Sequence, residues 1–131
     1  MMLLSRGIKK EDGFTLIEIL VVIAVISVLA AIAVMQYQKF NVRAFDTAAK
    51  SDLRNAMIAL EAYFSVKLVY PATSSELLAN GLNLSPKVSF TKYKIEPWGG
   101  EKTVHMHVKH SGSSNTWHAN YPEEGSQIEI R

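Results

Sequence analysis

The pattern of hydrophobic and polar positions divides the chain into a strongly apolar segment and a mixed remainder. No charged residue occurs in the twenty positions from Ile19 to Gln38, and Ser27 is the only polar side chain in residues 19–34. An α-helix needs this length to cross a hydrocarbon layer about 30 Å thick. Because a helix of a soluble domain normally keeps a polar face, we expect this segment to span a membrane.

An amphipathic pattern continues beyond the apolar segment. Its apolar positions recur at spacings of three and four residues: Phe45, Ala49, Leu53, Ala56, Leu60 and either Tyr63 or Phe64. Such spacing predicts one buried helix face. Its charged positions are expected on the solvent side: Asp46, Lys50, Asp52, Arg54 and Glu61. No Gly or Pro occurs between Phe14 and Tyr70. We therefore predict one helix from Phe14 to Lys67, about 80 Å long, which Tyr70-Pro71 ends.

The C-terminal part of the chain carries short-helix, strand and turn signals. A capping-box pattern at Thr73–Glu76 predicts a short helix that stops at Gly81. Strands are expected over residues 88–95, 103–109, 115–121 and 127–130, with turns at 97–100 and 111–114. The predicted fold class is therefore α+β, with a long N-terminal helix packed on a small antiparallel sheet of three or four strands.

Alternation in the second predicted strand assigns its two faces. Val104, Met106 and Val108 should face the long helix, together with Trp117, whereas His105 and His107 should face outward. An H-x-H pair can bind zinc or copper. The chain has no cysteine to complete such a site, so we expect solvated histidines and no metal. A calcium site would have only Glu123-Glu124 to build on, and calcium requires six or more oxygen ligands.

Composition narrows the function classes. The absence of cysteine excludes a disulfide framework. The net charge is only +2, and the basic residues are scattered, so no specific nucleic-acid partner is expected. The chain has no nucleophile-elbow glycine pattern, no cysteine nucleophile and no clustered acid pair. We therefore expect neither an enzyme nor a cofactor.

The residues Gly13-Phe14-Thr15-Leu16-Ile17-Glu18 resemble the prepilin peptidase motif of type IV pilins and type II secretion pseudopilins. Residues 44–55 are also similar to the post-membrane helix of type IVa pilins. The resemblance implies cleavage between Gly13 and Phe14 and methylation of the new amine of Phe14. It also implies three parts: a cytoplasmic leader over residues 1–13, a transmembrane and filament-core helix over 14–38, and an extracytoplasmic pilin domain over 39–131.

Several residues of this motif have a physical rationale. A carboxylate inside a membrane helix costs on the order of 3 kcal/mol near the bilayer centre, so Glu18 is a candidate functional group. The resemblance implies that it pairs with the amine of Phe14 on a neighbouring subunit during assembly. An intramolecular pair with the amine of the same chain is equally reachable, because residues i and i+4 lie on one helix face. Glycine at position 13 leaves the scissile backbone unobstructed. The leader charges of Arg6, Lys9 and Lys10 should hold the leader in the cytoplasm.

The family pattern is broken at two positions of the hydrophobic helix. Many type IV pilins carry a glycine where this chain has Ser27 and a proline where it has Met35. Serine and methionine are far better tolerated inside a helix than glycine and proline. We therefore expect a straighter, more continuous helix in the isolated subunit.

The function implied by the resemblance is that of a structural subunit of a type IV pilus filament, used for adhesion, twitching motility or DNA uptake. Its expected partners are copies of itself, a prepilin peptidase, and an inner-membrane assembly platform with its ATPase. It would reside in the bacterial inner membrane before assembly and in a surface filament afterwards.

Three alternative functions also fit the sequence. The first is a pseudopilin of a type II secretion system. The second, from another class, is a monomeric single-pass membrane protein whose outer domain binds a ligand or a metal. The third is a secretory signal cut near Ala30–Ala33, although its apolar run is long for such a signal.

Overall fold

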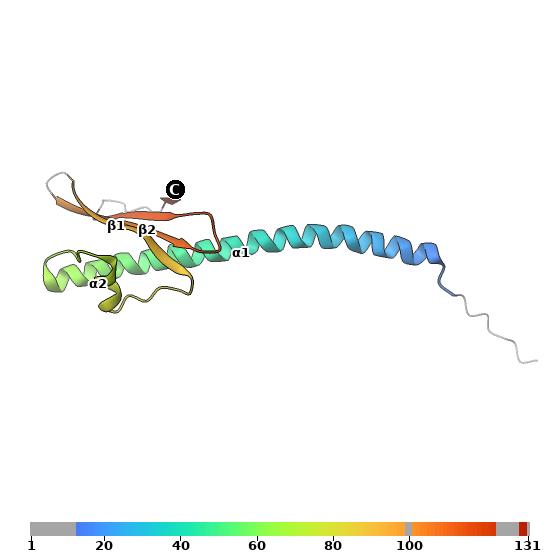
Figure 1. Ribbon diagram of the computed structural model, residues 1–131, viewed down its shortest axis with the longest axis horizontal. Coiled ribbons are helices and arrows are strands. Elements are labelled where there is room, and N and C mark those ends of the chain that lie inside the picture. The colour runs from blue at the N-terminus through green and yellow to red at the C-terminus, as the bar shows by residue number, and fades with distance from the viewer. Residues whose placement is uncertain (1–12, 99–100, 123–128, 131) are drawn as a thin grey trace, which may run out of the picture. The chain divides into compact units, whose positions relative to one another are not determined.

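The computed structural model describes residues 13–98, 101–122 and 129–130, and it has the predicted α+β class. Its elements are α1 (Leu16–Lys67), α2 (Ser74–Ala79), β1 (Val88–Trp98), β2 (Glu101–His110), β3 (Trp117–Tyr121) and β4 (Glu129–Ile130) (Figure 1). The chain separates into two compact units, residues 1–37 and 38–131. The first consists of the N-terminal half of α1, and the second contains the rest of α1, α2 and the sheet.

The helix α1 is continuous through both positions where the family pattern is broken, which confirms the expected continuity. The hydroxyl of Ser27 donates a hydrogen bond to the carbonyl oxygen of Ile23 at 2.7 Å. A serine that bonds back to the preceding turn leaves no unsatisfied polar group on an apolar helix surface. Met35 lies within the same uninterrupted helix.

The C-terminus of α1 lies at the predicted residue, but the predicted cause was wrong. The helix ends at Lys67 because Leu68 adopts a left-handed backbone conformation with φ of 57°. The amide of Leu68 still donates to the carbonyl oxygen of Phe64 at 2.8 Å. Glycine normally occupies such a position, and Pro71 follows only after the helix has already ended.

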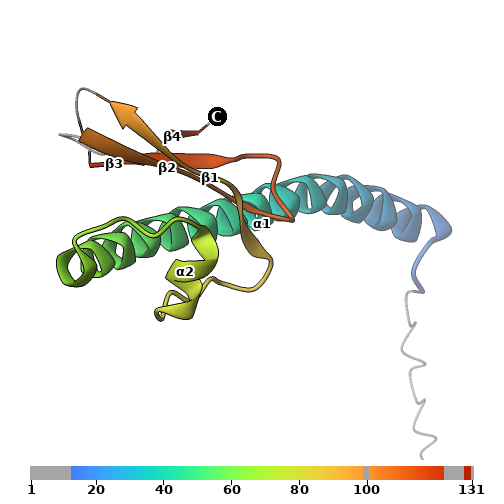
Figure 2. The same ribbon diagram turned by 60° about the vertical axis from the view of Figure 1, so that its left-hand side comes forward.

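The four strands form one antiparallel sheet in the order β1-β2-β3-β4 (Figure 2). Val104 pairs with Ile95 and Tyr121, and Met106 pairs with Tyr93 and Ala119. Val104, Met106 and Val108 are fully buried, as the alternation predicted.

One of the predicted turns was misplaced. Strand β1 continues through Pro97 and Trp98, where the sequence indicated the beginning of a turn. Pro97 pairs with Lys102 of β2. Proline is tolerated here because β1 is an edge strand. The remaining turn residues, Gly99 and Gly100, lie outside the described residues.

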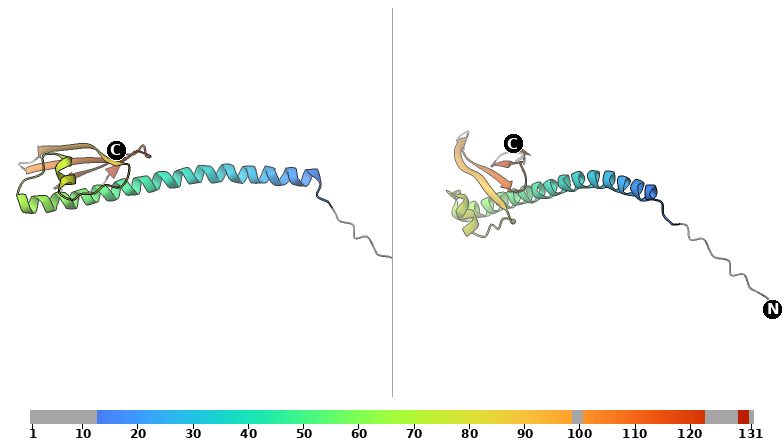
Figure 3. Two further views of the ribbon diagram at one scale, coloured as in Figure 1. Left: turned by 60° about the horizontal axis from the view of Figure 1, so that its bottom comes forward. Right: turned by 45° about the vertical axis from the view of Figure 1, so that its right-hand side comes forward.

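The core of the second unit lies between the sheet and the C-terminal half of α1 (Figures 2 and 3). The helix contributes the predicted face, with Ala49, Leu53, Ala56 and Leu60 each at most 1% exposed. The sheet contributes the three inward side chains of β2 together with Ala119. Leu77 of α2 closes the core from the side. Trp117 is half-buried against this core, with the ammonium of Lys50 5.3 Å from its ring centroid.

Two acidic residues predicted on the solvent side of α1 instead bind loops of the sheet domain. The carboxylate of Asp52, only 3% exposed, accepts hydrogen bonds from the amide and the hydroxyl of Ser85 at 2.6 and 3.1 Å. The carboxylate of half-buried Asp46 accepts from the hydroxyl of Ser113 and from the side-chain amide of Asn115. Buried carboxylates require such partners, so these two residues tie the connecting loops to the helix.

Of the two signals predicted for the short helix α2, its start and its stop, the structure confirms the stop. It ends at Ala79, and Gly81 follows with φ of 101°, as expected for a glycine that terminates a helix. The capping box was wrong in detail, because the side chain of Thr73 makes no capping hydrogen bond. Instead, the carboxylate of Glu76 accepts a hydrogen bond from the amide of Ala72 at 2.9 Å.

Tyr93 makes the stability of the sheet domain sensitive to alkaline pH. Its hydroxyl donates to the carbonyl oxygen of Pro71 at 2.8 Å. Burial, and then the nearby Glu76 and Tyr63, raise the pKa of this phenol. Since an unfolded tyrosine ionises near pH 10, the stability contributed by neutral Tyr93 is present below about pH 10 and is lost as the pH rises toward its folded pKa.

We therefore expect the full-length protein in micelles to lose stability steeply above about pH 10, and Tyr93→Phe to flatten that decline. At neutral pH the variant should lose about 1 kcal/mol, because it lacks one hydrogen bond. Urea unfolding at a series of pH values measures both effects. Tyr37→Phe, at an exposed position on α1, is the control. Equal alkaline slopes for wild type and Tyr93→Phe would contradict the assignment.

Candidate functional site

The N-terminus of α1 is closed by a hydrogen-bonded pair that the sequence reasoning missed. The carboxylate Oε2 of Glu18 accepts from the backbone amide of Thr15 at 2.7 Å and from its hydroxyl at 2.8 Å. The amide of Glu18 in turn donates to the hydroxyl oxygen of Thr15 at 3.3 Å. This is a capping box, with Thr15 immediately before the first helical residue. The pattern T-x-x-E was visible in the sequence at this position.

The capping box leaves one oxygen of Glu18 available. Both contacts from Thr15 are to Oε2, and no hydrogen bond to Oε1 occurs within the described residues. The carboxylate is therefore held in place at the helix start while half of its acceptor capacity remains open. Such a group can accept a cationic donor without giving up its role in the capping box.

The helix surface around Glu18 is apolar and uncovered. Phe14 and Leu16 are 81% and 83% exposed, and the large apolar side chains from Ile17 to Phe40 are exposed as well. Monomeric soluble proteins rarely expose contiguous apolar surface of this extent. In the described part of the chain, α1 is long and apolar enough to cross a bilayer.

The structure describes only some of the predicted processing residues. Gly13 is exposed, and a Cβ placed on it would meet no atom within 4 Å. Packing within this chain therefore gives no reason for a glycine here. Phe14 follows it, before the first turn of α1. Arg6, Lys9 and Lys10 lie outside the described residues.

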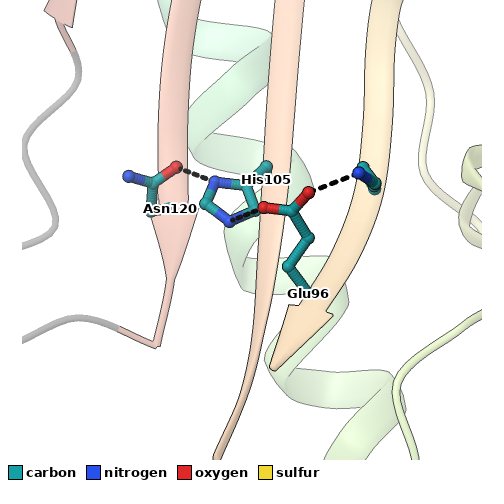
Figure 4. A network of polar contacts seen from close by, with 4 residues as sticks. Glu96, His105 and Asn120 are labelled. Carbon is teal, nitrogen blue, oxygen red and sulfur yellow. Dashed lines mark hydrogen bonds and ion pairs between the residues drawn. The ribbon is translucent and has the colours of Figure 1, made fainter. Parts of the chain in front are cut away.

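One histidine of β2, His105, contacts side chains of both neighbouring strands. Figure 4 shows His105 between Asn120 and Glu96, which come from the neighbouring strands. Its Nδ1 is 2.7 Å from Oδ1 of Asn120, and its Nε2 is 3.4 Å from Oε2 of Glu96. Glu96 also forms an ion pair with Lys94, which lowers the pKa of the carboxyl group. The prediction of a solvated side chain was therefore wrong for His105, because two cross-strand partners bind it.

The other described histidines make ring contacts. The rings of His107 and His118 lie beside each other, with centroids 5.7 Å apart. His110 is buried and stacks on Phe45 of α1 at 4.2 Å. Among the residues that the structure describes, no group of three or more histidines and carboxylates is placed to hold a metal ion. Glu123 and Glu124, considered for calcium, lie outside the described ranges.

The class of the protein is defined by a long helix whose N-terminal half is capped and apolar and whose C-terminal half packs on a small antiparallel sheet. Comparisons with known proteins give the same class. Residues 8–34 match the family of the prokaryotic N-terminal methylation motif. The chain is similar to the type IV wide pilus major component PilA4 of Thermus thermophilus, with 31% identity over 89% of this chain and 86% of the relative.

Two further relatives have names that give different roles, one in secretion and one in a pilus. The type II secretion system core protein G of Pseudomonas aeruginosa is 32% identical, over 70% of each chain. The type IV major pilin protein PilA of Myxococcus xanthus is 38% identical over 58% of this chain, which spans about a third (34%) of that relative's length. The chain belongs to the family of type IV pilins and type II secretion pseudopilins.

Proposed function

We propose that the protein is a structural subunit of a type IV pilus filament. The observation that carries this proposal is the uncovered apolar half of α1, which begins with the Thr15–Glu18 capping box. Outside a bilayer, such a surface needs other helices to cover it. Copies of the same helix meet that need in a filament core.

The proposed processing removes residues 1–13 and makes Phe14 the N-terminus. A peptidase would cut after Gly13, whose exposed backbone offers access, and the amine of Phe14 would then be methylated. Arg6, Lys9 and Lys10 would hold the leader on the cytoplasmic side of the bacterial inner membrane. Residues 14–38 would anchor the subunit, and residues 39–131 would lie outside the cytoplasm.

Assembly would follow from the chemistry of the new N-terminus. The cleaved Phe14 carries an ammonium group, and Oε1 of Glu18 is the open acceptor on the same apolar surface. An ion pair in surroundings of low dielectric constant is stronger than one in water. Pairing between neighbouring subunits would therefore fix one axial register of the helices. Leaving lipid for a helix bundle yields little hydrophobic gain, so we propose an ATPase-driven assembly platform as the source of work.

A pseudopilin of a type II secretion system is the second candidate function. The similarity to a core protein G over 70% of both chains supports it. The longer coverage of the wide-pilus component PilA4 favours the pilus. Visualising surface filaments on cells, and their loss on deletion, distinguishes a long pilus from a short secretion fibre.

The first prediction concerns the N-terminus of the native protein. Mass spectrometry of the protein purified from its own cells should find a chain that begins at N-methylated Phe14. The Gly13→Val variant should accumulate with residues 1–13 attached, because a branched side chain obstructs the scissile backbone. Ala62→Val, at an exposed position of α1 far from the cleavage site, is the control for processing. A native chain that begins at Met1 and stays monomeric would instead indicate a single-pass membrane protein.

A further inference from the structure

A cleft of about 600 Å³ lies at the end of α1 within the second unit. It is lined by Phe64, Leu68, Val69, Tyr70, Lys102, Tyr121 and Pro122. The volume and the mainly apolar, aromatic lining are those of small-molecule sites. The cleft lies outside the apolar half of α1 that the proposed filament core uses, so the function proposed above does not account for it.

The aromatic side chains that line the cleft pack against one another. The ring of Phe64 stacks on Tyr70 with centroids 4.6 Å apart and planes 22° apart, and Tyr121 meets Tyr70 edge-on at 6.3 Å. Burial, and then the nearby Glu61 carboxylate, raise the pKa of Tyr121. These three rings offer preformed aromatic faces to a planar apolar group.

The conformation of Leu68 is not explained by stability. Its φ of 57° lies in the left-handed region, which bulky residues rarely adopt. Its side chain is 75% exposed, and the adjacent Val69 is 57% exposed. A glycine or an asparagine would end the helix with less strain. Strained residues that line a cavity are candidates for a binding role, and Leu68 presents its side chain at the cleft.

The charges of the cleft select one kind of ligand. Among the described residues that line it, Lys102 carries the only charge. Lys102 is exposed and has no ion-pair partner among these residues. Glu61 lies near Tyr121 without lining the cleft, so an anionic group is better placed at Lys102 than at the phenol.

We propose that this cleft binds a small amphipathic anion, an aromatic carboxylate or sulfonate, with its rings against Phe64, Tyr70 and Leu68 and its acidic group at Lys102. The probe for the test is naphthalene-2-sulfonate. It is added to the isotope-labelled full-length protein in micelles of a zwitterionic, deuterated detergent, and amide NMR shifts are followed. Micelles without protein measure partitioning of the probe into detergent.

We expect saturable shifts at the amides of Leu68, Lys102 and Tyr121. Lys102→Gln should weaken binding about three- to fivefold, the range of an exposed ion pair. Lys92→Gln, an exposed lysine of β1 outside the cleft, should leave it unchanged. Glu61→Gln should tighten binding slightly, because it removes a negative charge near Tyr121. The neutral analogue naphthalene-2-methanol should bind more weakly than the sulfonate.

A second variant separates binding from folding. Leu68→Asn should raise the unfolding midpoint or leave it unchanged, because asparagine tolerates the left-handed region, and it should weaken probe binding about fivefold through lost apolar contact. Val66→Asn, 77% exposed on the last turns of α1, is the matched control and should not affect binding. Unsaturable shifts, equal binding by Lys102→Gln and wild type, or concentration-dependent shifts at these amides without probe would overturn the proposal. The last result would assign the cleft to a second copy of the chain.

Discussion

Replacing Glu18 with alanine is expected to abolish filament formation while the sheet domain stays folded. The variant loses the acceptor proposed for the ammonium of Phe14, and a charge left unpaired in apolar surroundings costs on the order of 3 kcal/mol. A penalty of that size lowers the equilibrium for adding each subunit more than a hundredfold. Shearing filaments from cells and quantifying the subunit, beside total membrane content, measures the effect.

A conservative variant distinguishes charge pairing from helix capping. Glu18→Gln keeps an oxygen for the amide and hydroxyl of Thr15, and glutamine is accepted in a capping box. It removes the charge that would pair with Phe14. We therefore expect Glu18→Gln to assemble as poorly as the alanine variant, whereas Thr15→Ser, which keeps the capping hydroxyl, should assemble normally.

The control is a carboxylate of the same helix outside the apolar segment. Glu61→Gln should assemble like wild type, because Glu61 is exposed on the part of α1 that packs on the sheet domain. Normal filament yield from Glu18→Gln would show that the charge is dispensable and that capping alone matters. Normal yield from Glu18→Ala would remove the proposed role of this residue in assembly.

Leu53→Ala is expected to cost the sheet domain about 3 kcal/mol of unfolding free energy. Leu53 is fully buried at the centre of the core between α1 and β2. Truncation removes apolar contacts and leaves a cavity that the surrounding side chains fill only partly. Trp117 is half-buried against the same core, so its fluorescence during urea unfolding of the full-length protein in micelles reports the change.

The matched control is Ile58→Ala. Ile58 lies on the same helix, five residues further along, and its side chain is 61% exposed. Substitutions at such surface positions usually change stability by less than about 0.5 kcal/mol. Similar midpoints for the two variants would show that the helix and the sheet do not share one cooperative core.

Local pattern predicted the elements well where one physical effect dominated. The apolar face of α1 repeats at helical spacing, and Ala49, Leu53, Ala56 and Leu60 are buried as expected. Alternation in β2 assigned its inward side chains correctly, because successive residues of a strand point to opposite faces. The sequence predicted a capping box at Thr73, whereas the structure has one at Thr15. The T-x-x-E pattern occurs at both places, and only the local backbone distinguishes them.

Long-range polar contacts could not be read from local pattern. Asp52 bonds Ser85, 33 residues away, and Asp46 bonds Ser113 and Asn115, 67 and 69 residues away. A charge on an amphipathic helix is normally solvated. Only the fold shows that a loop covers these carboxylates. The same holds for His105, which meets Glu96 and Asn120 only because β1 and β3 flank β2.

The sequence by itself determined the long N-terminal helix, its uncharged segment and the motif at Gly13-Phe14 and Glu18, because composition and spacing along one chain specify these features. Only the tertiary structure decided which carboxylates of α1 are buried, and that Phe64, Tyr70 and Tyr121 line one cleft with Lys102. These features depend on side chains brought together from distant positions, and sequence spacing carries no record of that proximity.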